Sequence, residues 1–445
     1  MYKVFFITFG CKVNHYETEC MKKSFSDAGF EPVHSQEGAD AVVINSCTVT
    51  SSGDSRVLSA LRKARKELPE AVIALTGCYP QAAPEEAAKL SEADIICGTK
   101  ERKKIPQLVA ECLRERKRLV SLSRYAPGEP FECLECPPFD DNTRAFLKIQ
   151  DGCDRFCSYC IIPYARGRSR SKPLSVIRDE ARQIASSGKK EIVLTGINLA
   201  FYGDGKGCDL ADAVEACAAE EGIVRIRLGS LEPEVMSDDM LGRLAASGKV
   251  CPQFHLSLQS GCTRTLKAMN RRYTAEEYYE LACRIRKLFP DCAFTTDVMV
   301  GFPGETDEDH RESADFIKKI GFSRVHIFRY SRRKGTPADR MKEQVPESVK
   351  SARAADMALA ASQTEEKYMQ SLVGKTVEVL FERENCTEFH TGHAADYTLI
   401  KIPRKNPEKS LRNQLRSVII EESRQDHCIG RMTDDCDLNS KHTGG

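Results

Sequence analysis

Short apolar runs alternate with helix-period segments along the first 125 residues. Residues 4–9, 41–45 and 71–76 are typical of buried strands, whereas residues 16–28 and 55–68 repeat apolar side chains with a helical period. Strands that alternate with helices predict a parallel sheet. We therefore expect an N-terminal α/β domain over residues 1–125.

A second strand–helix series follows a Pro- and Gly-rich stretch, residues 126–142, that predicts a linker. The pattern indicates a partial (β/α) barrel over residues 143–370, with the working residues at the carboxyl ends of its strands. The predicted strands are residues 145–150, 191–195, 224–228, 254–258, 294–300 and 324–330, and the helical patterns include residues 174–185, 275–288, 307–320 and 348–369.

The chain changes character after residue 370. Residues 376–381, 397–402 and 415–420 have a β pattern and are joined by short segments, which predicts a small β-barrel over residues 371–422. The polar residues 423–445 predict a flexible tail. The expected fold class is thus α/β, with a parallel-sheet domain, a partial barrel and a small β-barrel.

Composition and charge narrow the class of protein. The 445 residues include 66 Lys and Arg against 65 Asp and Glu, and 41% are hydrophobic, which excludes a wholly disordered or polybasic chain. No apolar run is long enough to span a bilayer, and the first residues do not follow a secretory signal pattern. We expect a cytoplasmic protein without a membrane partner.

Twenty cysteines stand out in this composition. In a reducing compartment they indicate metal-binding or catalytic thiolates rather than disulfides. Cys153, Cys157 and Cys160 form a C-x3-C-x2-C triplet directly after the first predicted barrel strand. This spacing places three thiolates around one face of a cubane iron–sulfur cluster and leaves one iron without a protein ligand.

Three further cysteines follow the predicted strands of the first domain. Cys11, Cys47 and Cys78 each lie one or two residues beyond the carboxyl end of a strand. Because parallel strands end at one edge of the sheet, topology brings these residues towards a shared site. Topology alone equally allows three unrelated loop cysteines.

Zinc is the alternative metal. Cys133-x2-Cys136, twenty residues, and Cys157-x2-Cys160 approach the zinc-ribbon template. This interpretation gives Cys153 no role and does not explain the barrel. A non-catalytic zinc-binding or RNA-binding protein stays a distant alternative, and Cys133 and Cys136 receive no role.

The combined motifs resemble the methylthiotransferase family of radical S-adenosylmethionine enzymes. The resemblance extends over residues 1–422 and is greatest to the MtaB-type branch, which acts on N6-threonylcarbamoyladenosine in tRNA. It rests on Gly10-Cys-Lys-Val-Asn14, Asn45-Ser-Cys47-Thr-Val49, Thr76-Gly-Cys78 and the segment from Asp151 to Arg170, with Tyr159 just before the last cysteine of the triplet.

The resemblance implies two 4Fe-4S clusters and S-adenosylmethionine as cofactors. One cluster would be held by Cys153, Cys157 and Cys160, and the second by Cys11, Cys47 and Cys78. No catalytic residue is implied beyond these ligands. Positions after barrel strands are candidate S-adenosylmethionine contacts, although the two glycines among them equally suit a tight turn: Tyr159, Asn198, Glu232, Gln259, Gly301, Gly304 and Glu305.

The implied activity is conversion of N6-threonylcarbamoyladenosine, next to the tRNA anticodon, to its 2-methylthio derivative. Sister families leave two alternative substrates, isopentenyladenosine in tRNA and an aspartate of a ribosomal protein. The electron donor and the sulfur source are not identified by the sequence.

Two basic stretches favour an RNA partner. Residues 144–172 contain seven basic and two acidic residues, and residues 401–416 contain six and one. The alternative is an ordinary solvated surface. The predicted tRNA contacts are Arg166, Arg168, Arg170, Lys401, Arg404 and Lys405.

Overall fold

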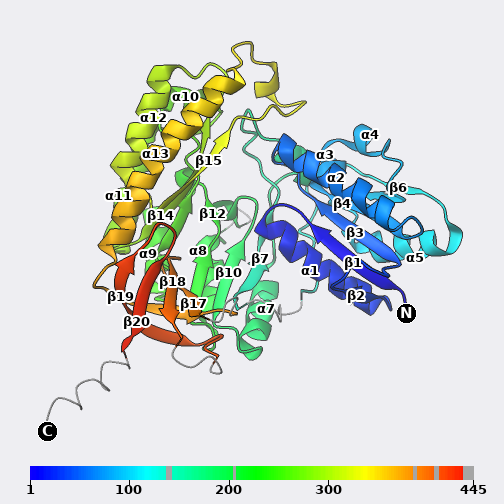
Figure 1. Cartoon of the computed structure of the whole chain (residues 1–445), viewed down its shortest axis with the longest axis horizontal. Helices are drawn as coiled ribbons and strands as arrows, with labels where there is room; N and C mark the ends of the chain where they lie inside the picture. Colours follow the sequence, from blue (N-terminus) through cyan, green and yellow to red (C-terminus); the bar gives the residue numbers. More distant parts are fainter. Residues whose placement is uncertain (137–142, 204–206, 384–387, 405–409, 434–445) are drawn as a thin grey trace, which may run out of the picture.

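A computed structural model describes residues 1–136, 143–203, 207–383, 388–404 and 410–433. Figure 1 shows the first domain beside the barrel, and β7 is the barrel strand next to α1. The small barrel lies at one end of the barrel strands and α10 at the other. The predicted α/β fold class is confirmed.

The first domain is a six-stranded parallel sheet in the order β2-β1-β3-β4-β5-β6. Strands β3 and β4 are buried along their whole length, because helices cover both faces of the sheet. The strands are β1 (Lys3–Thr8), β2 (Glu31–Val33), β3 (Ala41–Ser46), β4 (Val72–Gly77), β5 (Ile95–Cys97) and β6 (Leu119–Ser121), and the helices are α1 (Lys12–Asp27), α2 (Ser51–Glu67), α3 (Cys78–Ala82), α4 (Pro84–Ala87) and α5 (Ile105–Glu115).

The second domain is an open barrel of parallel strands in two sheets, β11-β10-β7 and β12-β13-β14-β15. All six predicted strands are present, as β7 (Ala145–Lys148) with β8 (Gln150–Asp151), β10 (Glu191–Thr195), β11 (Arg225–Leu228), β13 (Gln253–Leu256), β14 (Ala293–Val300) and β15 (Arg324–Arg329); β9 (Arg170–Ser171) and β12 (Ser230–Leu231) are short. The helices are α6 (Ile162–Arg166), α7 (Leu174–Ser186), α8 (Leu210–Ala218), α9 (Asp238–Ala246), α10 (Thr263–Ala268), α11 (Ala275–Leu288), α12 (Asp307–Ile320) and α13 (Glu347–Ser371).

The third unit is a closed barrel in the order β16-β17-β18-β20-β19. Its strands are β16 (Thr376–Phe381), β17 (Phe389–Ala394), β18 (Leu399–Pro403), β19 (Leu415–Ser423) and β20 (Cys428–Met432). The prediction of a flexible tail over residues 423–445 is wrong for residues 428–432. They form β20, which pairs with β19 and β18. Polar residues and a central glycine weaken the apolar alternation of β17 and β20, so their strand signal is faint.

Buried ion pairs join the first domain to the barrel. Glu17 Oε1 of α1 lies 2.6 Å from Lys148 Nζ and 2.8 Å from Arg166 Nη1, and Glu17 Oε2 lies 3.0 Å from Arg102 Nη1. Asp151 completes the group, 2.7 Å from Lys148 and 3.0 Å from Arg166. We call these five residues the interdomain ion cluster; their side chains are at most 3% exposed.

Two other contacts join the barrel to its neighbours, one to the first domain and one to the small barrel. Arg333, after β15, donates to the carbonyl oxygen of Thr48 at 2.6 Å and pairs with Asp54 of α2 at 2.8 Å. Arg225 of β11 donates to the carbonyl oxygen of Glu378 in the small barrel at 2.6 Å. Within the described ranges, no helix is long and apolar enough to cross a membrane.

Replacing Glu17 by Ala leaves Arg102, Lys148 and Arg166 with one buried counter-charge fewer. We expect this variant to lose about 3–5 kcal/mol of unfolding free energy in denaturant titrations. Glu19 is a matched control in the same helix, because its side chain is 32% exposed and pairs with Lys22. Glu19→Ala should cost at most about 1 kcal/mol. Equal effects of the two changes would contradict the importance of the interdomain ion cluster.

The same interaction predicts a pH dependence. Burial opposes ionisation, but the charges of Arg102, Arg166 and Lys148 prevail and lower the pKa of Glu17 to about 2, from 4.5. Because the pKa of Glu17 is lower in the folded than in the unfolded protein, its contribution to the free energy of unfolding is complete above the pKa of the unfolded state. This contribution is lost as the pH falls through about 2. The stability difference between the wild type and Glu17→Gln should therefore persist at neutral pH and shrink in acid.

Candidate active site

The three cysteines of the first domain meet at the carboxyl edge of its sheet. Cys11 precedes α1, Cys47 follows β3, and Cys78 begins α3 directly after β4. Gly10 allows the first two to approach, because a Cβ at this position would lie 2.6 Å from Cys47 Cβ. Burial raises the pKa of both Cys47 and Cys78, and charge on the nearby Cys11 raises each pKa further.

Two buried polar side chains tie the three cysteine loops together. Asn14 Nδ2 donates to the carbonyl oxygens of Phe9, at 2.7 Å, and Ser46, at 3.0 Å. Ser46 Oγ donates to the carbonyl oxygen of Thr76 at 2.5 Å and accepts from the backbone N–H of Tyr79 at 3.1 Å. Each contact lies within two residues of a cysteine, so these hydrogen bonds fix the backbone of the three cysteine loops.

The barrel triplet lies in the loop between β8 and α6. Its backbone is fixed by Cys153 N–H, which donates to the carbonyl oxygen of Gly167 at 3.0 Å, and by Ser158 N–H, which donates to that of Met269 at 3.0 Å. Arg271 Nη1 lies 3.4 Å from Cys157 Sγ, and its Nη2 pairs with Glu232 at 2.6 Å. A cation therefore faces one of the predicted thiolates.

The thiol chemistry fits clusters that displace protons on binding. Burial raises the pKa of Cys78 and of Cys160 to about 12, so both are protonated when free at neutral pH. A metal must replace those protons. Neither triplet gathers its sulfur atoms within 4.8 Å, a spacing that among the described residues only Cys262, Asp309 and Glu312 achieve.

The surroundings of Cys136 do not support the zinc-ribbon alternative. Cys136 packs with Tyr16 and Cys20 of α1 and with Leu134, rather than with Cys157. Cys133, Cys136, Cys157 and Cys160 do not form a group of close ligand atoms, although the structure describes all four.

Three of the predicted S-adenosylmethionine contacts surround the barrel triplet. Asn198 Nδ2 lies 3.8 Å from Cys153 Sγ, and its buried Oδ1 has no hydrogen-bond partner among the described residues. Glu232 reaches Cys157 through Arg271. The ring of Tyr159 packs edge-on against Phe302, with centroids 6.5 Å apart. The unused Asn198 oxygen is a free acceptor for a ligand beside the triplet.

The other four predicted contacts have structural partners. Gln259 lies between β13 and β14 and has a φ of 69°. Gly301 and Gly304 have positive φ, and Glu305 accepts from the backbone N–H groups of Gly301 and Phe302, the latter at 3.1 Å. The Glu305 carboxylate thus closes the turn after β14, and its part in cofactor binding stays a prediction.

The predicted tRNA contacts differ in their surroundings. The prediction is wrong for Arg166, which is completely buried in the interdomain ion cluster. Arg168 is exposed, and the Arg170 side chain is 8% exposed beneath Tyr125. Lys401 and Arg404 are half-buried in the small barrel, and Lys405 lies outside the described residues.

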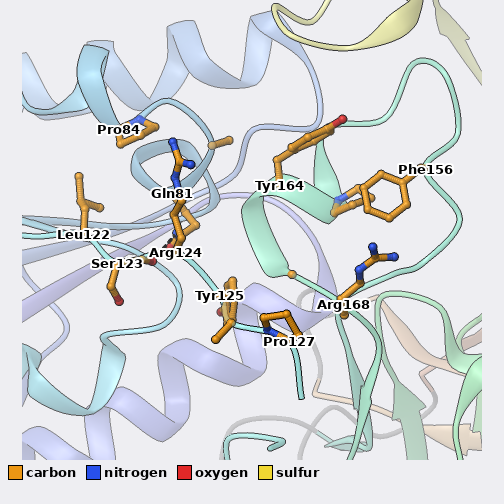
Figure 2. A pocket seen from close by; sticks show the side chains of 14 residues that line it. Gln81, Pro84, Leu122, Ser123, Arg124, Tyr125, Pro127, Phe156, Tyr164 and Arg168 are labelled. Atoms are coloured by element: carbon orange, nitrogen blue, oxygen red, sulfur yellow. Dashed lines mark hydrogen bonds between the residues drawn. The ribbon is translucent and has the colours of Figure 1, made fainter. Parts of the chain in front are cut away.

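A cleft of about 570 Å³ is lined by Phe156 of the triplet loop and by residues of the first domain (Figure 2). Its walls come from Gln81 at the end of α3, from residues 122–127, and from the loop and helix that hold Phe156, Tyr164 and Arg168. The Phe156 and Tyr164 rings lie edge to face, 6.0 Å apart, and Tyr164 is 49% exposed. Exposed aromatic rings beside arginines are suited to unpaired nucleobases and phosphates.

Sequence reasoning missed Arg271 and the structural role of Arg166. Arg271 and Cys157 are 114 residues apart, and Glu17 and Arg166 are 149 apart. No local spacing signals such pairs. The one available signal was that Asp151 and Arg166 belong to the sequence motif around the barrel triplet, which placed them near the site.

Comparisons with known proteins agree with this architecture. Residues 147–317 match the Radical SAM superfamily, and residues 3–98 match the Uncharacterized protein family UPF0004. Threonylcarbamoyladenosine tRNA methylthiotransferase MtaB of Bacillus subtilis is 40% identical over 384 residues, which cover 86% of this chain and 85% of that protein. The chain belongs to the radical S-adenosylmethionine methylthiotransferase family. This membership implies a 4Fe-4S cluster and S-adenosylmethionine.

Other family members are similarly close. MtaB of Aquifex aeolicus is 38% identical over 388 residues, covering 86% of this chain and 93% of that protein. The tRNA-2-methylthio-N(6)-dimethylallyladenosine synthase of Caldicellulosiruptor saccharolyticus is 36% identical over 406 residues, covering 86% and 84%. The radical S-adenosylmethionine methyltransferase TsrM of Kitasatospora setae shares the fold, with a TM-score of 0.56, 16% identity, and coverage of 76% of this chain and 75% of that chain.

We expect Gly10→Ala to prevent loading of a cluster at Cys11, Cys47 and Cys78, because the new Cβ would collide with Cys47. Iron per chain after anaerobic reconstitution should fall from about eight to about four. Gly29→Ala is the control: Gly29 also has a positive φ, of 83°, but nothing lies within 4 Å of its added Cβ. Gly29→Ala should keep its iron. Its unfolding free energy should fall by about 1–2 kcal/mol, because alanine is strained in this left-handed backbone conformation. Unchanged iron in Gly10→Ala would refute the close packing of these loops.

Proposed function

We propose that this protein converts N6-threonylcarbamoyladenosine, next to the tRNA anticodon, to its 2-methylthio derivative, using S-adenosylmethionine and two 4Fe-4S clusters. One observation carries the proposal. Arg166, in the helix after the barrel triplet, donates to Asn14 Oδ1 at 2.6 Å, and Asn14 holds the loops of Cys11 and Cys47. A single side-chain contact thus connects the two cysteine triplets.

The chemistry explains why two triplets are needed. The C2–H bond of adenine has no acidic proton and no leaving group, so acid–base catalysis does not replace its hydrogen by sulfur. Cys153, Cys157 and Cys160 would hold a 4Fe-4S cluster, which would supply the one electron needed to split S-adenosylmethionine into methionine and a carbon radical. Cys11, Cys47 and Cys78 are then available to hold the second cluster, as the sulfur-handling site.

The surrounding residues position and tune these groups. Arg271 places a positive charge 3.4 Å from Cys157 Sγ. Asn198 orients a donor towards Cys153 and keeps an unused oxygen for the cofactor. The interdomain ion cluster keeps the first domain against the barrel, so that a base inserted between them meets both triplets.

The relatives favour the threonylcarbamoyl substrate. Three of them, 38–40% identical, are named for threonylcarbamoyladenosine, whereas those named for dimethylallyladenosine are 31–36% identical. A tRNA partner also suits the cleft of Figure 2, where the exposed Arg168 and Arg124 flank aromatic rings.

Deleting the gene tests the substrate directly. Nucleoside mass spectrometry of tRNA should show loss of the methylthio group from threonylcarbamoyladenosine, while the threonylcarbamoyl group itself remains. Reintroducing the gene should restore the product, and a Cys157→Ala copy should not. Loss of the methylthio group from isopentenyladenosine instead would replace the proposed substrate by that of the sister family.

Arg168→Ala should weaken tRNA binding about 3- to 10-fold and lower the slope of log affinity against log salt by about one, as expected for one lost phosphate contact. Arg311 on α12 is a matched control, because both arginines pair with a nearby carboxylate and their side chains are 64% and 68% exposed. Arg311→Ala should leave the affinity unchanged. Equal affinity of the two variants would remove Arg168 from the tRNA interface.

A further inference from the structure

Lys12 follows Cys11 and points towards the place where all three units meet. Its Nζ lies 5.8 Å from the centre of the Tyr397 ring, which belongs to the turn between β17 and β18 of the small barrel. Lys12 is also within electrostatic reach of His326 on β15 and Glu191 on β10. Lys12 is an exposed residue, and its ammonium group faces the ring of Tyr397.

The other cations at this junction already have partners. Arg144 pairs with Glu382, Arg225 with Glu378 at 3.2 Å, and Arg227 with Glu191 at 2.8 Å. Lys12, in contrast, has no hydrogen-bond or ion-pair partner among the described residues. The junction therefore keeps one unneutralised positive charge beside Cys11.

Two further features indicate that this place is built for a ligand. Arg227 is buried, yet its Nη2 has no hydrogen-bond partner among the residues that the structure describes. Tyr397 has a φ of 72°, an unusual conformation for a bulky residue, and its ring is held by Arg227, at 4.6 Å, and by His393, stacked at 4.7 Å. Backbone conformations of this kind are concentrated at ligand sites.

We propose that Lys12 binds the carboxylate of the substrate's threonylcarbamoyl group and so selects this base over uncharged analogues. The inference rests on the proposed function, because that function supplies a base with a carboxylate on its N6 substituent. The N6 substituent is attached to C6 of the adenine, which lies two bonds from C2 in the same ring. When C2 faces Cys11, the substituent therefore lies on a neighbouring side of the base. The adjacent Lys12 then meets the substituent, with Tyr397 as an apolar and aromatic wall.

An RNA phosphate is the other possible source of an anionic oxygen at this place. The two are separated by using three anticodon stem-loops of one sequence, which carry threonylcarbamoyladenosine, its methyl ester or unmodified adenosine. All share the same phosphates, and only the first has the carboxylate.

Binding is measured by fluorescence anisotropy on the anaerobically reconstituted full chain. The wild type should bind the threonylcarbamoyl stem-loop about 10- to 100-fold more tightly than the methyl ester, as expected for one charge-assisted hydrogen bond. Lys12→Met should remove this preference without changing affinity for the ester or for unmodified RNA. Lys12→Arg should keep most of the preference, and Lys66→Met on the exposed end of α2 should keep all of it.

Three outcomes would overturn the proposal. In the first, the wild type binds the acid and its ester with equal affinity. In the second, Lys12→Met weakens the binding of all three RNAs equally, as the loss of a phosphate contact would. In the third, Lys12→Met still prefers the acid to the ester. Iron content and visible absorption of each variant check that the adjacent Cys11 still holds its cluster. The gene-deletion experiment decides the substrate independently, so failure here and failure of the proposed function are distinguishable.

Discussion

The buried ion pairs between α1 and the barrel are the interaction on which this architecture depends. Glu17 and Asp151 pair with Arg102, Lys148 and Arg166, and Glu132 adds a third carboxylate 2.7 Å from Arg102. Burying five charges gains little stability over an apolar contact of the same size. What the charges supply is a fixed geometry, because Glu17 of the first domain meets Lys148 and Arg166 only when the barrel is in place.

That geometry holds the two cysteine triplets on facing sides of the contact between the first domain and the barrel, where we propose one active site. Each triplet is organised by its own domain, through Asn14 and Ser46 on one side and through Arg271 on the other. Arg166 belongs to both, since it emerges from the helix after the barrel triplet and ends on Asn14 and Glu17. In the proposed function, radical chemistry at one triplet and sulfur chemistry at the other require such a fixed separation. The small barrel adds Tyr397 to the same place, beside Lys12.

The sequence predicted what depends on local periodicity and spacing. The strands before Cys11, Cys47 and Cys78 and the helices α11 and α12 are where the pattern places them, since their apolar faces repeat regularly. Strands β17 and β20 were missed, because a small closed barrel tolerates polar residues and glycine in strands that pair on both sides. Arg166 was misassigned to RNA, because a basic residue in a basic stretch gives no local sign that its partners, Glu17 and Asn14, are buried with it.

The central claim is that one chain holds two iron–sulfur clusters, one for each cysteine triplet. Mössbauer spectroscopy of anaerobically reconstituted protein tests it most directly, with the wild type compared with two triple variants in which Cys11, Cys47 and Cys78, or Cys153, Cys157 and Cys160, are replaced by Ala. The account predicts about eight irons per chain in the wild type, all in cubane clusters, and about four in each variant. A wild type with about four irons, or with zinc at either triplet, would contradict it.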